Sequence, residues 1–223
     1  MNFNLCTFLI LICCWLPLQA QNSQVLSGAK NEVTNKTKYN TDMLSKYVAP
    51  TFFNGKNLNK PVYPDGDVNP SEGVCADLVV RALRYAGIDL QKRVHEDILS
   101  NLNSYGIKTP DKYIDHRRVW VLLKYFKRNY KSLSTEVDGT DSHWKHGDII
   151  IWDIGLKDHY HIGIISDKKS GNRPLVIHNM RHLPFISPGI TCEQDVLSGP
   201  RAFGIRVKRW KILGHFRIDE PKQ

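Results

Sequence analysis

Long hydrophobic runs are scarce in the sequence, and this scarcity argues against a membrane-spanning protein. Outside the N-terminus, no stretch is long and apolar enough to cross a bilayer. The one concentrated apolar run, residues 8–16, is short for a membrane span, which makes an uncleaved anchor the weaker alternative. Leu-Gln-Ala follows it at residues 18–20 as a plausible cleavage site. We therefore predict a signal peptide over residues 1–20, secretion or export to the periplasm, and no transmembrane segment in the mature chain.

The chain is also poor in cysteine. Three of its five cysteines fall within the predicted signal peptide, which leaves Cys75 and Cys192 in the mature part. Two of those three are adjacent, but they follow Leu-Ile rather than the small residues of a lipidation site, so lipoprotein anchoring ranks second. In an oxidising compartment the two remaining cysteines can form one disulfide, or Cys75 can stay a free thiol. The sequence leaves this choice open.

The common metal and nucleic-acid motifs are missing as well. The sequence contains neither His-Glu-x-x-His nor a paired Cys-x-x-Cys, so we predict no metal site and no cofactor. A metal site would have to combine His159, His161 and His178 with Cys75 or Asp158. Basic residues are dispersed, with no basic helix and no aromatic RNA-binding motif, so we expect no nucleic-acid partner.

Positive charge is what the sequence has in excess. The formal net charge is +9, and residues 1–20 carry no charged side chain, so the whole excess belongs to the mature chain. In a secreted protein such a balance favours an anionic partner. We therefore expect peptidoglycan or another anionic polymer of the cell envelope to be the partner.

The order of hydrophobic patterns predicts the organisation of the chain. Residues 21–41 are polar without an apolar period and predict a flexible linker before one domain over residues 42–220. Helical periods come first and strand-like runs follow, which predicts an α+β fold with N-terminal helices packed on a C-terminal antiparallel sheet. The expected helices cover residues 75–86, 95–106 and 115–128, the last with Asp115 as N-cap, and the expected strands cover 148–152, 161–165, 175–178, 205–213 and 215–218.

One cysteine stands at the start of an amphipathic helical pattern. Apolar residues recur at helical spacing from Val79 to Ala86, and Gly87 supplies a stop, so Cys75 is predicted in the first turn. Unpaired N–H groups and the positive end of the helix dipole favour a thiolate there, and the thiolate is the nucleophile. The alternative is that Cys75 is a small buried hydrophobic residue.

A cysteine nucleophile needs a base and a group that orients the base. His161 begins one predicted strand and His178 ends the next, so the two imidazoles meet if those strands are antiparallel neighbours. His159 lies two residues before His161 and would share its face in a continuous strand, which makes it the competing base.

Four ordered motifs together resemble a known family. They are Gly-Val-Cys-Ala-Asp-Leu-Val at residues 73–79, Gly-Asp-Ile at 147–149 after a tryptophan, His-Ile-Gly-Ile at 161–164 and Val-Ile-His-Asn at 176–179. In order and spacing this set resembles the NlpC-type cell-wall cysteine peptidases of the papain-like superfamily. The resemblance implies a papain-like, NlpC-like fold with the nucleophile at a helix N-terminus.

Two further segments resemble a particular branch of that superfamily. They are Val-His-Glu-Asp at residues 94–97 and Ile-Asp-His-Arg-Arg-Val at 114–119. The branch has long been carried as a domain of unknown function in secreted bacterial proteins. The resemblance covers about residues 40–218.

The resemblance implies a role for several side chains. Cys75 would be the nucleophile, His161 the base and His178 the orienting group. Tyr63 lies twelve residues before the cysteine, as the tyrosine near the oxyanion hole does in the peptidases, although it can equally be a packing aromatic. The backbone N–H of Cys75 would help to bind the oxyanion. Asn179, which follows the orienting residue, is a further candidate substrate contact.

The chain departs from the peptidases just after the cysteine. Ala76-Asp77 replaces the usual Ser-Gly, which places a carboxylate near the nucleophile and makes Asp77 a candidate substrate contact. Asp77 can instead bond Arg117 or Arg118, or all three can be solvated charges. Cations are unfavourable in the first turn of a helix, so we expect at least one of the two arginines to clamp a carboxylate, in protein or substrate.

These observations support three functional hypotheses. The first is a secreted thiol hydrolase that cleaves an amide bond in peptidoglycan peptides. The second is a non-catalytic cell-wall-binding module of the same fold. The third is a thiol hydrolase or acyltransferase that acts on lipid or protein.

Overall fold

The computed structural model describes most of the chain. Its described residues are 19–41, 52–53, 56–57, 63–64, 66–137, 143–155, 159–184, 187–202 and 205–222. The predicted signal peptide therefore lies outside the described residues except for its last two positions. The predicted start of the domain at residue 42 lies outside them too.

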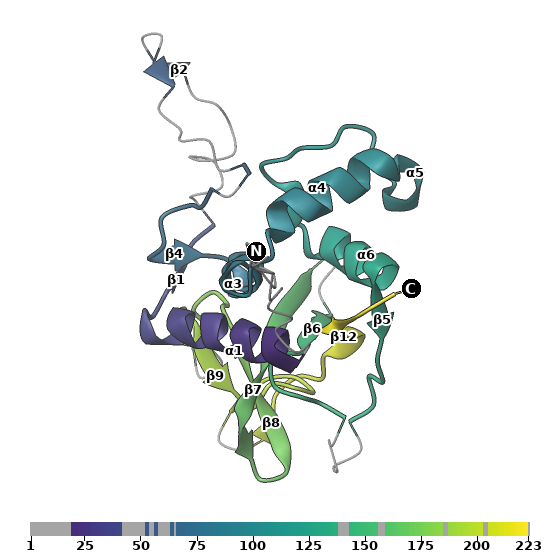
Figure 1. Ribbon diagram of the computed structural model, residues 1–223. Helices are drawn as coiled ribbons and strands as arrows, with labels where there is room; N and C mark the ends of the chain where they lie inside the picture. The colour runs from purple at the N-terminus through teal and green to yellow at the C-terminus, as the bar shows by residue number, and fades with distance from the viewer. Residues whose placement is uncertain are drawn as a thin grey trace, which may run out of the picture.

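A six-stranded antiparallel sheet forms the centre of the fold (Figure 1). Its strand order is β5-β12-β6-β7-β8-β9, and each neighbouring pair is antiparallel. The strands are β5 (Tyr130–Ser132), β6 (Ile149–Asp153), β7 (Tyr160–Ser170), β8 (Arg173–His178), β9 (Cys192–Gln194) and β12 (Lys211–Pro221).

Helices from residues 19–129 cover one face of this sheet. They are α1 (Gln19–Thr34), α3 (Cys75–Tyr85), α4 (Leu90–Ser100), α5 (Leu102–Tyr105), the 3-10 helix η1 (Asp115–Arg117) and α6 (Val119–Asn129). Figure 1 shows α4, α5 and α6 together at one end of the molecule and the β7–β8 hairpin at the other. The predicted α+β class, with helices packed on an antiparallel sheet, is confirmed at this level.

Three two-stranded pairs complete the described elements. The parallel pair β1 with β4 joins the segment after α1 to the residues just before α3, and its register pairs Tyr39 with Gly73. The other two pairs are antiparallel. The strands are β1 (Lys38–Tyr39), β4 (Glu72–Gly73), β2 (Phe52–Phe53), β3 (Lys56–Asn57), β10 (Arg201–Ala202) and β11 (Ile205–Arg206).

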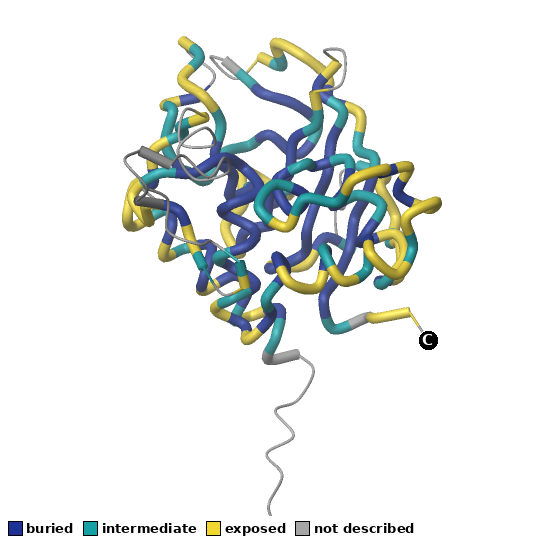
Figure 2. The backbone as a smooth tube through the Cα atoms, turned by 90° about the horizontal axis from the view of Figure 1, so that it is seen from above, coloured by how far each residue is buried: buried dark blue, intermediate teal, exposed yellow. Residues whose placement is uncertain are grey.

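Both faces of the central strands are buried, as Figure 2 shows along the middle of the molecule. In β6, Ile149 and Ile151 join the core under the helices, whereas Ile150 and Trp152 join a second core on the opposite face. Successive side chains of a strand point to opposite faces, so a strand buried on both sides reads as an uninterrupted apolar run. This explains why Ile-Ile-Ile-Trp was recognisable as a strand without any alternation.

The structure corrects the prediction of a flexible linker over residues 21–41. Residues 19–34 form α1, and Val25, Leu26 and Ala29 are buried in the core. The apolar stripe is short, but α1 approaches α3 very closely through Gly28. A Cβ added to Gly28 would lie 2.8 Å from the Cα of Ala82. The close approach buries α1 with few apolar side chains, so the sequence pattern gave little sign of it.

We expect Gly28→Ala to destabilise the protein although alanine is the better helix former. The new methyl group would lie 2.7 Å from the Tyr85 Cβ and 2.8 Å from the Ala82 Cα, so α1 must move away from α3. Overpacking of this kind costs about 1–3 kcal/mol of unfolding free energy. Urea unfolding monitored by circular dichroism measures it. Ser27→Ala, on the exposed side of the same helix, is the matched control, and equal midpoints for the two variants would contradict the close packing.

Two boundary predictions are also wrong. Asp115 is not the N-cap of α6, because it begins η1. Its carboxylate instead accepts a hydrogen bond from the backbone N–H of Asp111. The N-cap of α6 is Arg118. The two strands expected at 205–213 and 215–218 are replaced by the short β11 and by β12, which runs through Gly214 with a register shift between Ile212 and Gly214. The short strands β5 and β9 had no recognisable pattern in the sequence.

Candidate active site

Cys75 is the first residue of α3, as the sequence predicts. Only Val74 separates it from β4, so the β1–β4 pair fixes the chain just before the cysteine. The carboxylate of Asp77 accepts the backbone N–H of Val74 at 2.9 Å and caps the helix. The side chain of Cys75 is only 9% exposed and belongs to the core under the helices.

Burial decides the protonation state of this thiol. Desolvation raises the pKa of Cys75 to about 12, and the nearby Asp77 carboxylate adds to the rise, while the backbone N–H of Ile162 opposes it. The helix N-terminus favours a thiolate, as the sequence analysis assumed, but its effect is smaller than the cost of burying the charge. The expectation of a resting thiolate is therefore wrong, and Cys75 is a neutral thiol at neutral pH.

The two predicted histidines meet in the sheet. Antiparallel pairing of β7 with β8 brings His161 at the start of one strand beside His178 at the end of the other. The Nε2 atom of His161 lies 3.0 Å from the Nδ1 atom of His178, and both rings are buried. The antiparallel pairing of β7 with β8 therefore brings the two imidazoles together, as predicted.

A third residue, Gln194 of β9, fixes the tautomers of this pair. Its Oε1 lies 2.8 Å from Nε2 of His178, so that nitrogen carries the proton and donates it. Nδ1 of His178 must then accept, and it accepts from the Nε2–H of His161. The remaining nitrogen of His161, Nδ1, therefore carries a lone pair and can act as a base.

Both imidazoles are neutral at neutral pH. Burial holds the pKa of His161 well below its ordinary value, and the neighbouring His178 acts in the same direction. Burial lowers the pKa of His178 to about 4, although the hydrogen bond with Gln194 partly opposes this decrease. The ring of Trp152 stacks on His161 with centroids 5.6 Å apart, and Trp210 meets it edge-on at 5.4 Å. These indoles keep water away from the candidate base.

The cysteine and the histidine pair lie against the same strand. The sulfur of Cys75 is near enough to the N–H of Ile162, the residue after His161, for that group to lower its pKa. Within the described part of the chain, no hydrogen bond joins the sulfur to either imidazole. His159, the competing base, is exposed and precedes β7, so His161 alone pairs with His178.

A tyrosine that the sequence analysis missed lies near the cysteine. Burial raises the pKa of Tyr39 to about 12, with a further rise from a negative charge at Cys75, whereas the positive charge of Arg181 lowers it. Tyr39 pairs with Gly73 across β1 and β4, two residues before the cysteine. The exposed Arg181 follows β8 by three residues, just beyond His178. The signal was non-local, since only strand pairing brings residue 39 to residue 73.

Tyr63, the tyrosine expected near the oxyanion hole, has other neighbours. Its ring meets His95 of α4 edge-on with centroids 5.3 Å apart, and the Lys112 ammonium lies 5.7 Å from its centroid. These contacts correspond to the packing role that the sequence left open for it. Tyr39 takes its place beside the cysteine.

The remaining candidate contacts are engaged within the protein. Asp77 and Arg117 form a buried ion pair at 2.8 Å, which is one of the alternatives that the sequence left open. Arg118 donates to Asp115 at 2.9 Å. Asn179 is buried, and its amide donates at 3.4 Å to the backbone carbonyls of Thr37 and Gly73. Each arginine therefore clamps a carboxylate of the protein itself.

The two cysteines among the described residues, Cys75 and Cys192, are both free. The disulfide between Cys75 and Cys192 that the sequence left open is not formed. Cys192 lies opposite His178 in the pairing of β8 with β9, and burial raises the pKa of its thiol to about 11. Among the described residues, no three His, Cys, Asp or Glu side chains gather in a metal-binding arrangement.

The buried imidazoles predict a dependence of stability on pH. The unfolded chain titrates His178 near its ordinary pKa of 6.5, whereas the folded chain holds this pKa at about 4. Between these values the unfolded state binds more protons, so stability is full above pH 6.5 and falls as the pH drops through 4. The loss from His178 alone is roughly 3 kcal/mol, and His161 adds to it in the same direction.

Urea unfolding across pH 4–7 tests this dependence. His178→Gln removes the titrating group and should flatten the curve. His159→Gln, at the exposed position nearby, is the control and should leave the curve unchanged. If the stability of His178→Gln falls as steeply between pH 7 and pH 4 as that of the parent protein, groups other than His178 cause the loss at low pH.

Comparison with known proteins places the chain in a family. A family model described as "Domain of unknown function (DUF1287)" matches residues 26–218, which include both α3 and the sheet. The "Uncharacterized protein YijF" of Escherichia coli (strain K12) is 39% identical over 184 residues, covering 79% of this chain and 78% of the relative. No solved structure matches the chain. In the described part of the chain, every helix is too short or too polar to span a membrane.

Proposed function

The chain belongs to the DUF1287 family, and we propose that it is a thiol hydrolase with Cys75 as nucleophile, His161 as base and His178 as orienting group. The observation that carries the proposal is the hydrogen-bond chain from His161 through His178 to Gln194. It leaves an unprotonated nitrogen on a buried imidazole, in the strand that contacts the cysteine. This is the geometry of a base held by an orienting group, and it is shared by unrelated cysteine and serine hydrolases.

The proposed reaction has two steps. The sulfur of Cys75 bonds to the carbonyl carbon of an amide while its proton passes to Nδ1 of His161. The carbon–nitrogen bond then breaks, and the same proton goes to the leaving amine. Water next attacks the carbonyl carbon of the thioester while His161 takes a proton from the water. The carbon–sulfur bond then breaks, the carboxylic acid product leaves, and His161 returns the proton to the sulfur. Because the thiol is neutral at rest, deprotonation accompanies attack rather than preceding it.

Two groups can stabilise the oxyanion. The backbone N–H of Cys75 lies in the first turn of α3, where the helix itself offers no acceptor. The hydroxyl of Tyr39 stays protonated because its pKa is raised to about 12, so it can donate a hydrogen bond at neutral pH. Tyr39 thus assumes the role that the family resemblance implied for Tyr63.

Charge supports peptidoglycan peptides as the substrate class. The net charge of +9 and the predicted signal peptide favour an anionic envelope polymer outside the cytoplasm. The stem peptides of peptidoglycan carry carboxylates next to amide bonds. Arg181, exposed and near Tyr39, is a guanidinium at the candidate site, whereas Arg117 and Arg118 are bound to protein carboxylates. We therefore assign substrate carboxylate binding to Arg181.

Digestion of purified sacculi tests the proposed function. The protein is incubated with sacculi, and the released fragments are identified by mass spectrometry. We expect fragments with new amine and carboxyl ends at one type of peptide bond. If the sacculi stay intact and the same thiol turns over an amide in a lipid or a protein, the substrate class is that lipid or protein rather than peptidoglycan.

One observation favours a non-catalytic wall-binding module as the second candidate. The Cys75 thiol is neutral and makes no hydrogen bond with His161 in the described structure. A binding module would sediment with sacculi without releasing any fragment. The digest and a sedimentation assay on the same sample separate the two functions.

A further inference from the structure

A cavity of about 480 Å³ lies on the face of the sheet opposite the helices. One part of its lining is cationic and consists of Arg206, Arg209 and Lys211, while Val137 and Ile212 supply apolar surface. The volume lies within the range of sites that hold small organic ligands. No residue of the candidate catalytic set lines it, so it is a separate feature of the molecule.

The charge around this cavity is unbalanced. Residues 196–218 contain six Lys or Arg side chains and no Asp or Glu. Among the residues that the structure describes, those that line the cavity include no Asp or Glu. Arg201 and Arg217 in the same stretch have carboxylate partners elsewhere, whereas the three cations of the cavity form no ion pair among the described residues. A bound anion would supply these cations with the negative partner that the described residues do not provide.

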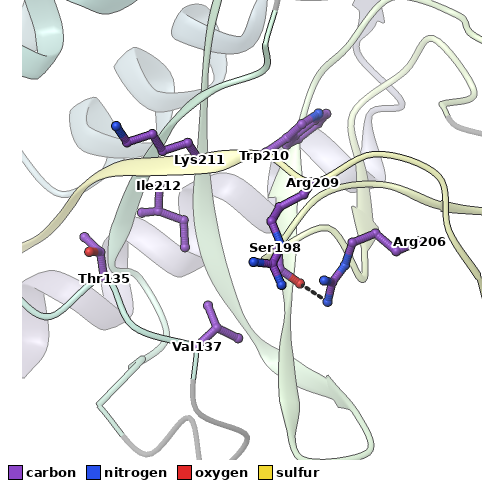
Figure 3. A pocket seen from close by; sticks show the side chains of 8 residues that line it. All are labelled: Thr135, Val137, Ser198, Arg206, Arg209, Trp210, Lys211 and Ile212. Carbon is purple, nitrogen blue, oxygen red and sulfur yellow. Dashed lines mark hydrogen bonds between the residues drawn. The ribbon is translucent and has the colours of Figure 1, made fainter.

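The arginines also have unused hydrogen-bond donors. Arg206 donates from Nη2 to the hydroxyl of Ser198 at 2.8 Å, and its buried Nε has no acceptor in the described structure. Figure 3 shows the guanidinium groups of Arg206 and Arg209 on the side of Ser198, with Val137 and Ile212 across from them. The ammonium group of Lys211 points away from the two guanidinium groups. The cationic part therefore consists mainly of two arginines, of which Arg206 is held by Ser198.

A single indole separates the cavity from the candidate base. Trp210 lines the cavity and is 4% exposed, and its ring meets His161 edge-on with centroids 5.4 Å apart. Ile212 of β12, which also lines the cavity, pairs in register with Trp152, and Trp152 pairs in turn with His161. A ligand in the cavity would contact the shell of side chains that holds the imidazole.

We propose that this cavity binds an oxyanion, a carboxylate or a phosphate, carried on a small apolar organic group. Planar guanidinium groups match both oxyanions with paired N–H donors. The apolar surface of Val137 and Ile212 favours a ligand with a hydrocarbon part over a bare inorganic ion. Binding here requires no hydrolysis, so this site extends beyond the proposed function and does not depend on it.

Titration with defined anions tests the site. Inorganic phosphate, acetate, butyl phosphate and valerate are each added at constant ionic strength, and binding is followed by calorimetry and tryptophan fluorescence. We expect saturable binding, with the alkyl-bearing member of each pair binding more tightly. The tighter of butyl phosphate and valerate identifies the preferred oxyanion. Absence of saturation by all four in the millimolar range would overturn the proposal.

Charge-matched variants make the test specific. Arg209→Gln, at an exposed position, should weaken binding by about tenfold or more, as expected for loss of a charged hydrogen-bond donor. Lys169→Gln removes the same charge from an exposed position on β7 outside the cavity and should leave the affinity unchanged. Equal weakening in both variants would reveal non-specific attraction and reject the site. The titration needs no turnover, so its result is distinguishable from that of the sacculus digest.

Discussion

Replacing Cys75 with alanine is expected to abolish fragment release from sacculi while leaving the fold intact. The sulfur forms the bond to the carbonyl carbon in the proposed reaction, and no other group can replace it. Loss of a catalytic nucleophile lowers the rate by on the order of 10⁴-fold or more. The side chain is small and lies at the first position of α3, where alanine is a good helix former. The rate of fragment release, read by mass spectrometry, measures the loss.

Cys192→Ala is the matched control for this variant. It removes the other free thiol among the described residues, which lies opposite His178 in the sheet. Retained activity in this variant would assign the loss to the sulfur at position 75 rather than to any thiol near the imidazoles. Unchanged fragment release in the Cys75→Ala protein, with circular dichroism matching the parent, would instead reject the thiol mechanism.

The candidate catalytic residues were predictable because each lies in a strong local pattern. Cys75 begins an amphipathic helix, and His161 and His178 sit at the ends of apolar strand-like runs. Gln194 was not predictable, since it belongs to a three-residue strand whose register depends on pairing with β8. Tyr39 was missed for the same reason. Its proximity to the cysteine arises from a two-residue parallel pair between segments over thirty residues apart.

The protonation states were not predictable from the helix position alone. The sequence placed Cys75 at a positive helix end, but the degree of burial is a tertiary property, and burial is the larger effect. The same applies to the expected fate of the arginines. Arg117 follows the prediction that it clamps a carboxylate, yet only the three-dimensional packing identifies Asp77 as its partner.

The N-terminal helix shows a different limit of sequence patterns. Its polar residues include a buried one, Asn22, whose amide donates to the Asp148 carboxylate at 3.0 Å. Across the contact, Gly147 has a positive φ of 82° and lies so close to the Asn22 carbonyl that a Cβ would be 2.1 Å from its oxygen. The Gly-Asp motif at residues 147 and 148 thus has a physical role, which is to dock α1 on the sheet.

Asp148→Ala is expected to destabilise the protein severely. The carboxylate is fully buried and accepts two hydrogen bonds from Arg217, both at 2.8 Å. It also accepts hydrogen bonds from the Asn22 amide and from the backbone N–H of Lys145. The Nε2 atom of His215 lies 2.8 Å from the same carboxylate. Burial raises the pKa of Asp148, but the hydrogen bonds of His215 and Arg217 outweigh it and hold this pKa below its ordinary value. Removing the anion takes from the largely buried Arg217 the carboxylate that it binds, which costs about 3–5 kcal/mol.

The matched control for this variant is Asp195→Ala. Its carboxylate binds Arg173 at 2.7 Å, but both side chains are partly exposed, so water replaces the lost partner and the cost is about 0–1 kcal/mol. Urea unfolding of the two variants compares a fully buried carboxylate with a partly exposed one. Single domains are stable by only about 5–15 kcal/mol, so Asp148→Ala should lose a large share of its stability. Similar midpoints for the two variants would show that α1 and β12 are held by their apolar contacts rather than by this carboxylate.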